Sequence, residues 1–213
     1  MAEKSNLKRA TEMKVKLTFL EEVLGTASAD PEIHREFIAS KAPDAPSRNA
    51  KIEEEIESVG LDDTVEKQMT VFPRDKEGNP ILWDYQVRGF FKSAAQAMSY
   101  VGGDKKLTAY KKKIDLLVFI NERQIPFVMP EGGSVMDCQR PLRAQTAQGE
   151  RVALANSETV PSGSTVEFTI HLEDSSLKDY VELWLDYGRR NGIGQWRNSG
   201  KGTFTWEKIE DWN

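Results

Sequence analysis

The residues that decide the fold lie in the last third of the chain and read Val160-Pro161-Ser162-Gly163-Ser164-Thr165-Val166-Glu167-Phe168-Thr169-Ile170-His171-Leu172. The Pro-Ser-Gly triplet is typical of a turn, because proline fixes one backbone angle and glycine accepts a positive φ. After this turn, apolar residues alternate with polar residues, which is the period of a strand with one buried face. The stretch therefore predicts a strand over 165–172 that starts from a tight turn.

A helix, a glycine-rich loop and a last strand are predicted after this strand. Ser176 and Asp179 suit a capping box at the start of a helix. Residues 192–202 read GIGQWRNSGKG, and Phe204 and Trp206 then alternate with threonines as in a closing strand. The expected buried positions of the helix are Leu177, Tyr180, Val181, Trp184 and Leu185.

The rest of the chain mixes strand and helix patterns. Alternation over 14–19 predicts a strand, and Asp30-Pro31 suits the start of a helix over about 31–41. Apolar residues at helical spacing predict a second helix over about 85–100. Short strands are expected at 70–73, 80–83, 114–120, 124–129, 140–145 and 151–154. The pattern indicates an α+β protein.

Composition indicates a globular protein of the cytoplasm. The chain has 213 residues, a net charge of −5 and no apolar run long enough to span a membrane. Cys138 is the single cysteine, so an intrachain disulfide is excluded and Cys-rich zinc sites are not expected. We expect a flexible tail over 1–12 and a single domain over 13–213, with an acidic, Pro- and Ser-rich excursion at about 42–66.

Charge is distributed unevenly along the chain. Residues 53–66 carry acidic side chains with no basic residue among them, whereas five lysines occur between 105 and 113. A second basic group late in the chain consists of Arg189, Arg190, Arg197 and Lys201. A negative net charge argues against broad binding of nucleic acid, but a local basic surface remains compatible with it.

The glycine-rich segment is the strongest candidate for a binding site. Loops of this kind can direct several backbone N–H groups at one anion, and Arg197 and Lys201 would add positive charge. Trp196 offers a ring on which a nucleobase could stack. The alternative is a tight connection in which glycines only permit close packing. The segment has neither a dinucleotide fingerprint nor a P-loop, and we expect no cofactor and no metal.

Two segments together resemble a known family. The run over 160–172, with the helix, glycine loop and Thr203-Phe204 that follow, is similar to the C-terminal part of RAMP superfamily proteins, particularly the backbone subunits of CRISPR effector complexes. The segment PILWDYQVRGFFKSAAQA at 80–97 resembles the strand-to-helix segment of the same family. The resemblance implies a ferredoxin-like (RRM-like) βαββαβ fold, with an antiparallel sheet, helices packed on one face and binding along a guide RNA backbone.

The resemblance also implies which residues contact RNA. Carried over by position, Arg88, Gly89 and Lys92 would lie near the RNA-facing start of the second helix. Asp84-Tyr85-Gln86 replaces the small residues usual there, and no segment matches the Asp-bearing loop of target-cleaving members. The glycine loop would contribute Gly192, Gly194, Arg197, Gly200, Lys201 and Gly202.

Three functions are compatible with these residues. The first is a non-catalytic RNA-binding module, whose partners would be an RNA such as a guide RNA and other subunits of a ribonucleoprotein or antiviral defence complex. The second is an interaction subunit or inhibitor that keeps the RAMP shape, as a stand-alone relative of phage type would. The third is a metal-independent endoribonuclease, for which His34 is the catalytic candidate, since His171 is expected on the outward face of a strand.

Overall fold

A four-stranded antiparallel sheet forms the centre of the molecule, in the order β11-β1-β10-β6. The computed structural model describes residues 10–29, 69–101, 107–146 and 149–213. The helix expected at 31–41 and the acidic excursion at 42–66 lie outside these residues. The strands of the sheet are β1 (Thr11–Phe19), β6 (Val118–Ile120), β10 (Thr165–Leu172) and β11 (Phe204–Glu210).

Alternating side chains make one face of this sheet apolar. Val15 lies opposite Phe168 and Leu17 opposite Val166, and these side chains are buried. Because the period of a strand is two, the polar residues between them face the other way. Burying each such side chain contributes about 1.5–3 kcal/mol, which fixes the register of β1 against β10.

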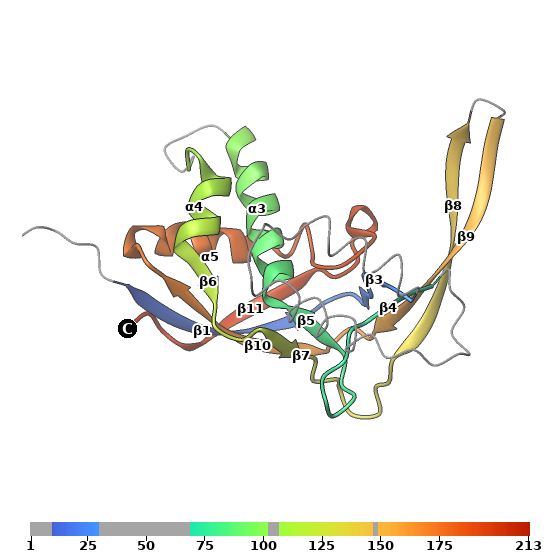
Figure 1. Cartoon of the computed structure of the whole chain (residues 1–213), viewed down its shortest axis with the longest axis horizontal. Helices are drawn as coiled ribbons and strands as arrows, with labels where there is room; N and C mark the ends of the chain where they lie inside the picture. Colours follow the sequence, from blue (N-terminus) through green and yellow to red (C-terminus); the bar gives the residue numbers. More distant parts are fainter. Residues whose placement is uncertain (1–9, 30–68, 102–106, 147–148) are drawn as a thin grey trace, which may run out of the picture.

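The helices cover the apolar face of the sheet (Figure 1). The buried side of α3 meets α5 through Phe91 and Trp184, whose ring centres lie 5.8 Å apart. The stripe predicted for α5 is buried as expected except Tyr180, which is half-buried. The helices are α3 (Asp84–Tyr100), α4 (Tyr110–Leu117) and α5 (Lys178–Tyr187).

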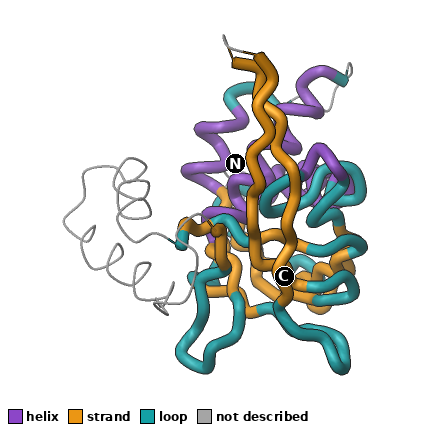
Figure 2. The backbone as a smooth tube through the Cα atoms, turned by 90° about the vertical axis from the view of Figure 1, so that its right-hand side faces the viewer, coloured by secondary structure: helices purple, strands orange, loops and turns teal. Residues whose placement is uncertain are grey.

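A second sheet carries a long hairpin that stands apart from the helices (Figure 1), and the two strands of the hairpin run side by side (Figure 2). Its order is β2-β9-β4-β3, and β8 pairs with β9 along the whole hairpin. The strands of this sheet are β2 (Val23–Leu24), β3 (Ala27–Ser28), β4 (Met69–Val71), β8 (Met136–Thr146) and β9 (Gly149–Val160). A separate pair consists of β5 (Ile81–Trp83) and β7 (Gln124–Pro126).

The prediction of an α+β protein with an antiparallel sheet is confirmed by the central sheet, whereas β4 and β9 of the second sheet pair in parallel. Along the chain, the central sheet and its helices follow as strand, helices, strand, strand, helix, strand, with the other strands inserted between them. Strand β1 begins at Thr11, whose side chain is buried.

Several predicted elements were wrong in detail. Residues 114–117 belong to α4 instead of a strand, because Ile114 and Leu117 pack against the core from a helix and only 118–120 pair with β10. The strands expected at 70–73 and 80–83 are shorter in the structure, where Met69–Val71 pairs with β9 and Ile81–Trp83 pairs with β7. The short strands at 140–145 and 151–154 are parts of one long hairpin. No capping box forms at Ser176; instead, the Asp174 carboxylate accepts a hydrogen bond from its amide.

Candidate functional site

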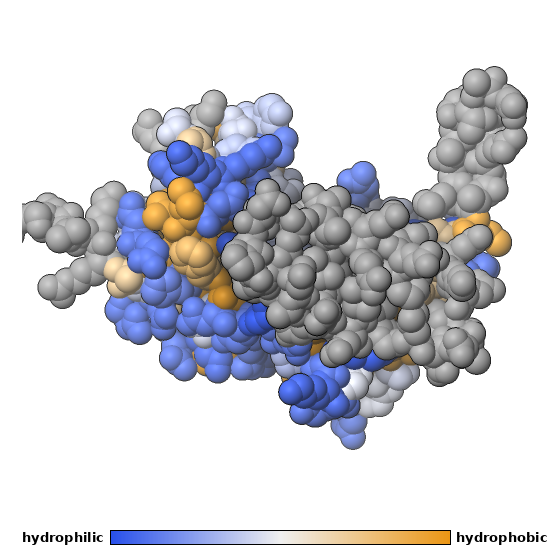
Figure 3. Space-filling model, viewed as in Figure 1, coloured by the Kyte–Doolittle hydropathy of each residue, from blue (hydrophilic) through white to orange (hydrophobic). Residues whose placement is uncertain are grey.

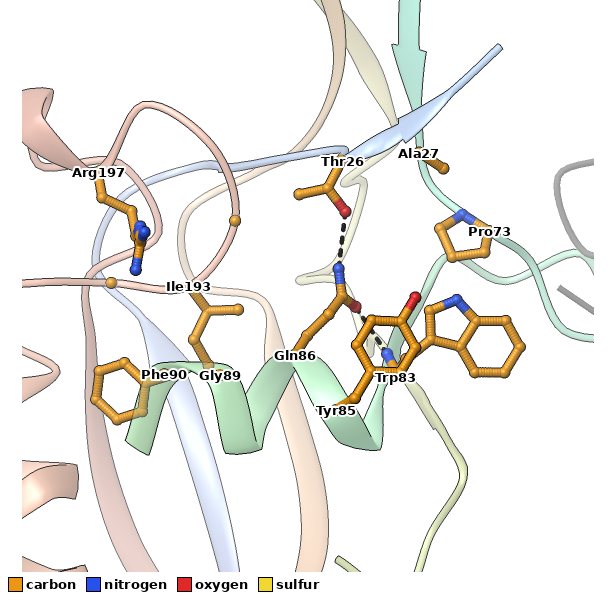
Figure 4. Close-up of a pocket in the computed structure, with 12 residues that line it drawn as sticks. Thr26, Ala27, Pro73, Trp83, Tyr85, Gln86, Gly89, Phe90, Ile193 and Arg197 are labelled. Atoms are coloured by element: carbon orange, nitrogen blue, oxygen red, sulfur yellow. Dashed lines mark hydrogen bonds between the residues drawn. The ribbon is translucent and has the colours of Figure 1, made fainter. Parts of the chain in front are cut away.

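A pocket of about 340 Å³ lies between the start of α3 and the glycine-rich segment 192–202, called the glycine loop below. The close-up in Figure 4 shows Gln86 and Gly89 on the helix and Ile193 and Arg197 on the loop facing this space. The structure thus brings together two segments that lie about half the chain apart. The lining residues are Thr26, Ala27, Pro73, Trp83, Tyr85, Gln86, Gly89, Phe90, Gly192, Ile193, Gly194 and Arg197.

Glycines at the base of the loop allow its two arms to touch. A Cβ on Gly202 would lie 1.8 Å from the carbonyl oxygen of Ile193, and one on Gly192 would lie 2.0 Å from the backbone of Gly202. The amide of Ile193 also donates a 3.0 Å hydrogen bond to the carbonyl oxygen of Gly202. These glycines are therefore needed for the shape of the loop itself, as the alternative of close packing predicts.

At Gly89, in contrast, no close contact among the described residues requires a glycine. Gly89 is exposed inside α3, and a Cβ built on it would meet no atom of the described residues within 4 Å. Glycine inside a helix lowers stability by about 1 kcal/mol relative to alanine. A ligand can approach the backbone closely only where no side chain stands in its way. The open space at Gly89 therefore suits a position in the pocket wall that a ligand contacts.

The start of α3 is held by hydrogen bonds and an ion pair. The amide of Trp83 donates to Gln86 Oε1 at 2.8 Å, and Gln86 Nε2 donates to Thr26 Oγ1 at 2.7 Å. Asp84 forms an ion pair with Arg123, whose guanidinium also lies 4.7 Å from the Trp83 ring centre. The negative charge of Asp84 is therefore balanced on the protein.

The predicted cations have different environments. The side chain of Arg197 points into the pocket (Figure 4), and the part of the chain that the structure describes holds no ion-pair partner for it. Lys92 pairs with Asp115 at 2.5 Å. Arg88 is half-buried, and its Nε has no hydrogen-bond partner among the described residues. Arg189 and Arg190 are exposed in the turn after α5.

Lys201 is tied to two carboxylates of the turn after β1. Its Nζ lies 2.9 Å from Glu22 Oε1 and 3.2 Å from Glu21 Oε2. The hydrogen bond to Glu22, followed by that to Glu21, raises the pKa of Lys201 above its usual value. This lysine anchors the loop to the rest of the fold.

The remaining predicted residues lie around the same loop. Trp196 and Gly200 both have a positive φ, and Trp196 is exposed next to Arg197. His34 lies outside the described residues. His171 is half-buried, and its Nδ1 lies 2.9 Å from Glu12 Oε1.

Sequence patterns missed several pocket residues. Thr26, Ala27 and Pro73 come from segments without a motif, and no local signal marks them. Gln86 could have been recognised, because its position three residues after Trp83 suits a side chain that reaches back to the helix start.

The pocket is lined by the kinds of group that bind a ligand. Its lining combines the cation of Arg197 with aromatic rings, glycine backbone and the amide of Gln86, and its described residues include no carboxylate, thiol or imidazole. Among the described residues, no group of three or more His, Cys, Asp or Glu side chains could hold a metal ion. Such a lining suits an anion that carries a flat ring.

Comparison with known proteins gives similarities of shape alone. No protein-family model matches the chain, and no curated protein sequence matches it. One solved structure, a Type III-B Cmr-beta complex bound to cognate target RNA, contains a chain with a TM-score of 0.46 and 11% identity; the match covers 95% of this chain and 61% of that one. A second, a Type IV-B CRISPR complex, has a TM-score of 0.46 and 9% identity, with coverages of 93% and 90%. This chain therefore spans about three fifths of the chain that it matches in the Cmr-beta structure.

Within the described ranges, no helix combines the length and the apolar character that crossing a membrane requires.

Proposed function

We propose that the chain is a non-catalytic RNA-binding module of RAMP type, which grips the backbone of single-stranded RNA as part of, or directed at, a CRISPR-like ribonucleoprotein complex. The observation that carries this proposal is the shared pocket, in which Gly89 of α3 faces Arg197 and the backbone of Gly192 and Gly194. These are residues of the two segments whose sequences resemble RNA-facing parts of that family.

The connectivity supports the architecture in this proposal. In the sheet order β11-β1-β10-β6, the helices α3 and α4 connect β1 to β6, and α5 connects β10 to β11. This is the arrangement expected of a ferredoxin-like core that carries insertions. We assign it to a single domain over 13–213.

Electrostatics limits the kind of RNA contact. The net charge is −5, and the charges of Lys92 and Lys201 are satisfied by carboxylates on the protein. Affinity therefore depends on the cations that have no carboxylate partner among the described residues, Arg197 at the pocket and the exposed Arg189 and Arg190, together with the loop backbone and the open surface at Gly89. Binding should be moderate and should weaken with added salt.

Fluorescence anisotropy with labelled single-stranded RNA tests this proposal. We expect salt-sensitive binding at micromolar protein, and Arg197→Ala should weaken it roughly 10-fold or more, because a hydrogen bond to a charged group contributes about 1.5–3 kcal/mol. Lys111→Ala is the matched control, because Lys111 is an exposed cation on α4 away from the pocket lining. No binding at low salt, or equal loss in both variants, would contradict the proposal.

A second candidate is a protein-docking role for the same fold. Figure 3 shows hydrophobic surface where α4 and β6 lie, and Leu116 and Phe119 on these elements are 58% and 37% exposed. An apolar patch on a monomer often marks a contact with another protein. Affinity purification under native conditions that retrieved RNA and no stoichiometric protein would count against this role.

A further inference from the structure

A buried arginine at the base of the projecting hairpin reaches the glycine loop. Arg140 lies in β8 with 6% of its surface exposed. Its Nη1 donates a hydrogen bond to Ser157 Oγ on β9, and its Nη2 donates one to Gln195 Oε1, both at 2.8 Å. Its guanidinium carbon also lies 5.3 Å from the centre of the Trp196 ring. One side chain thus connects the hairpin to two consecutive residues of the loop.

Among the described residues, no carboxylate forms an ion pair with Arg140. Its described contacts are a hydroxyl, an amide oxygen and a ring, and its buried Nε has no partner in the described part of the chain. Burying a cation in this way is unfavourable, and an apolar side chain that filled the same space would be at least as stable. The need to fill space therefore does not explain why an arginine lies at this position. Its contacts with the loop explain it.

The first effect concerns the orientation of Gln195. A guanidinium only donates hydrogen bonds, so the amide oxygen of Gln195 must face Arg140. The amide nitrogen, with its two donor hydrogens, has no partner among the described residues. Gln195 lines a second pocket of about 380 Å³, which residues 194–198 form. Arg140 therefore holds Gln195 as a hydrogen-bond donor at this pocket.

The second effect concerns Trp196, which lines the same pocket and is 39% exposed. Its φ of 56° is uncommon for a bulky side chain and marks a strained backbone. The contact with Arg140 stabilises the ring in this position through a cation–π interaction. A large apolar ring is thus kept at the surface, next to the donor of Gln195.

We propose that Arg140 is a positioning residue that holds Gln195 and Trp196 as a platform for one unpaired nucleobase of single-stranded RNA. The base stacks on the Trp196 ring, and the Gln195 amide donates to a carbonyl oxygen or ring nitrogen on its edge. This inference rests on the proposed RNA-binding function. It adds a contact that depends on the base, whereas Arg197 and the loop backbone contact phosphate.

Two oligomers of equal length test the platform by fluorescence anisotropy: oligouridine, and an abasic ribose-phosphate strand that lacks bases. The wild type should bind oligouridine roughly 10-fold more tightly, because stacking on an aromatic side chain contributes about this much per base. Trp196→Gly should remove this preference and leave the abasic affinity unchanged. It should also keep the fold, because glycine accepts the positive φ at this position.

Two further variants separate positioning from a structural role. Gln195→Glu keeps an acceptor for Arg140 but removes the donor hydrogens, so it should lose preference for oligouridine while the melting temperature stays the same or rises. Arg140→Met should reduce the preference in the same direction, with folding checked by circular dichroism. Tyr100→Ala is the control, because Tyr100 is an exposed aromatic residue at the far end of α3.

Each outcome decides between the proposals. Equal binding of both oligomers by the wild type would overturn the platform and leave RNA binding intact. An undiminished preference for oligouridine in Trp196→Gly, Gln195→Glu or folded Arg140→Met would also overturn the platform and leave RNA binding intact. Binding of neither oligomer would overturn the proposed function, and the platform with it.

Discussion

The ammonium group of Lys201 lies 2.9 Å from a carboxylate oxygen of Glu22, so the glycine loop is fastened to the turn that follows β1. The two residues are far apart in the sequence, and Glu21 shares the contact at 3.2 Å. The side chain of Lys201 is only 21% exposed, so solvent weakens this pair less than it weakens a fully exposed one.

Replacing this lysine should therefore affect stability more than RNA binding. We expect Lys201→Met to lower the free energy of unfolding by about 0.5–1 kcal/mol, and to weaken RNA binding less than Arg197→Ala does. The pKa of Lys201 is raised in the folded state, so its contribution is present below about pH 10.4, the usual value for lysine, and fades as the pH rises through the folded pKa. Urea unfolding of both proteins at neutral and high pH measures this, and a difference that grows with pH would contradict it.

Replacing Gly89 should change the stability of the fold and the affinity for RNA in opposite directions. Gly89→Ala should raise the free energy of unfolding by about 0.5–1 kcal/mol, because alanine is the better helix former and the new methyl group has open space. The same methyl group narrows the pocket wall, so RNA affinity should fall. Gln96→Ala, at an exposed site of the same helix, is the control and should leave the RNA affinity unchanged. Undiminished RNA binding by Gly89→Ala would remove Gly89 from the site.

Gly200 and Gly202 can be compared to test whether close contact between the two arms of the loop requires glycine. Gly200 and Gly202 have φ values of 82° and 68°, but a Cβ at Gly200 meets open space and one at Gly202 meets the Ile193 carbonyl oxygen at 1.8 Å. Gly200→Ala should lose about 1–2 kcal/mol through backbone strain alone. Gly202→Ala should lose more, because the loop must also open. Chemical denaturation of both variants measures the difference, and equal losses would contradict it.

Glu12 should contribute to stability in a pH-dependent way. Hydrogen bonds from Asn121, and then from His171, lower the pKa of Glu12 in the folded state. Its contribution is therefore present above the unfolded value of about 4.3 and is lost as the pH falls through the folded pKa. We expect Glu12→Gln to be less stable than the wild type at neutral pH and equally stable in strong acid. Urea unfolding at both pH values checks this, and a pH-independent difference would exclude the mechanism.

The elements predicted correctly are those with a clear local period. Strand β10 was predicted with its bounds intact, and α3 to within one residue at its start, because alternation and helical spacing are properties of neighbouring residues. The apolar run from Ile114 to Ile120 suits both a strand and a helix, and packing against the core decided that it divides between α4 and β6. The pairing of β4 with β9 likewise depends on residues that are distant in sequence.

The candidate site could be predicted only in part. The glycine pattern marked the loop, and the sequence segment at the start of α3 marked its other wall. Local sequence could not indicate that Thr26 and Pro73 complete the pocket, since they come from segments without a motif.

The sequence by itself determined the main strands and helices and the position of the glycine loop, because periodicity and backbone freedom act over a few residues. Only the tertiary structure decided which charged side chains are paired with a carboxylate on the protein. Lys201 is paired with Glu21 and Glu22, whereas Arg140 is buried against Gln195 and Trp196 with no carboxylate partner in the part of the chain that the structure describes. The physical reason is that an ion pair or a buried cation depends on which distant segments the fold brings within a few ångströms, and no local pattern encodes that distance.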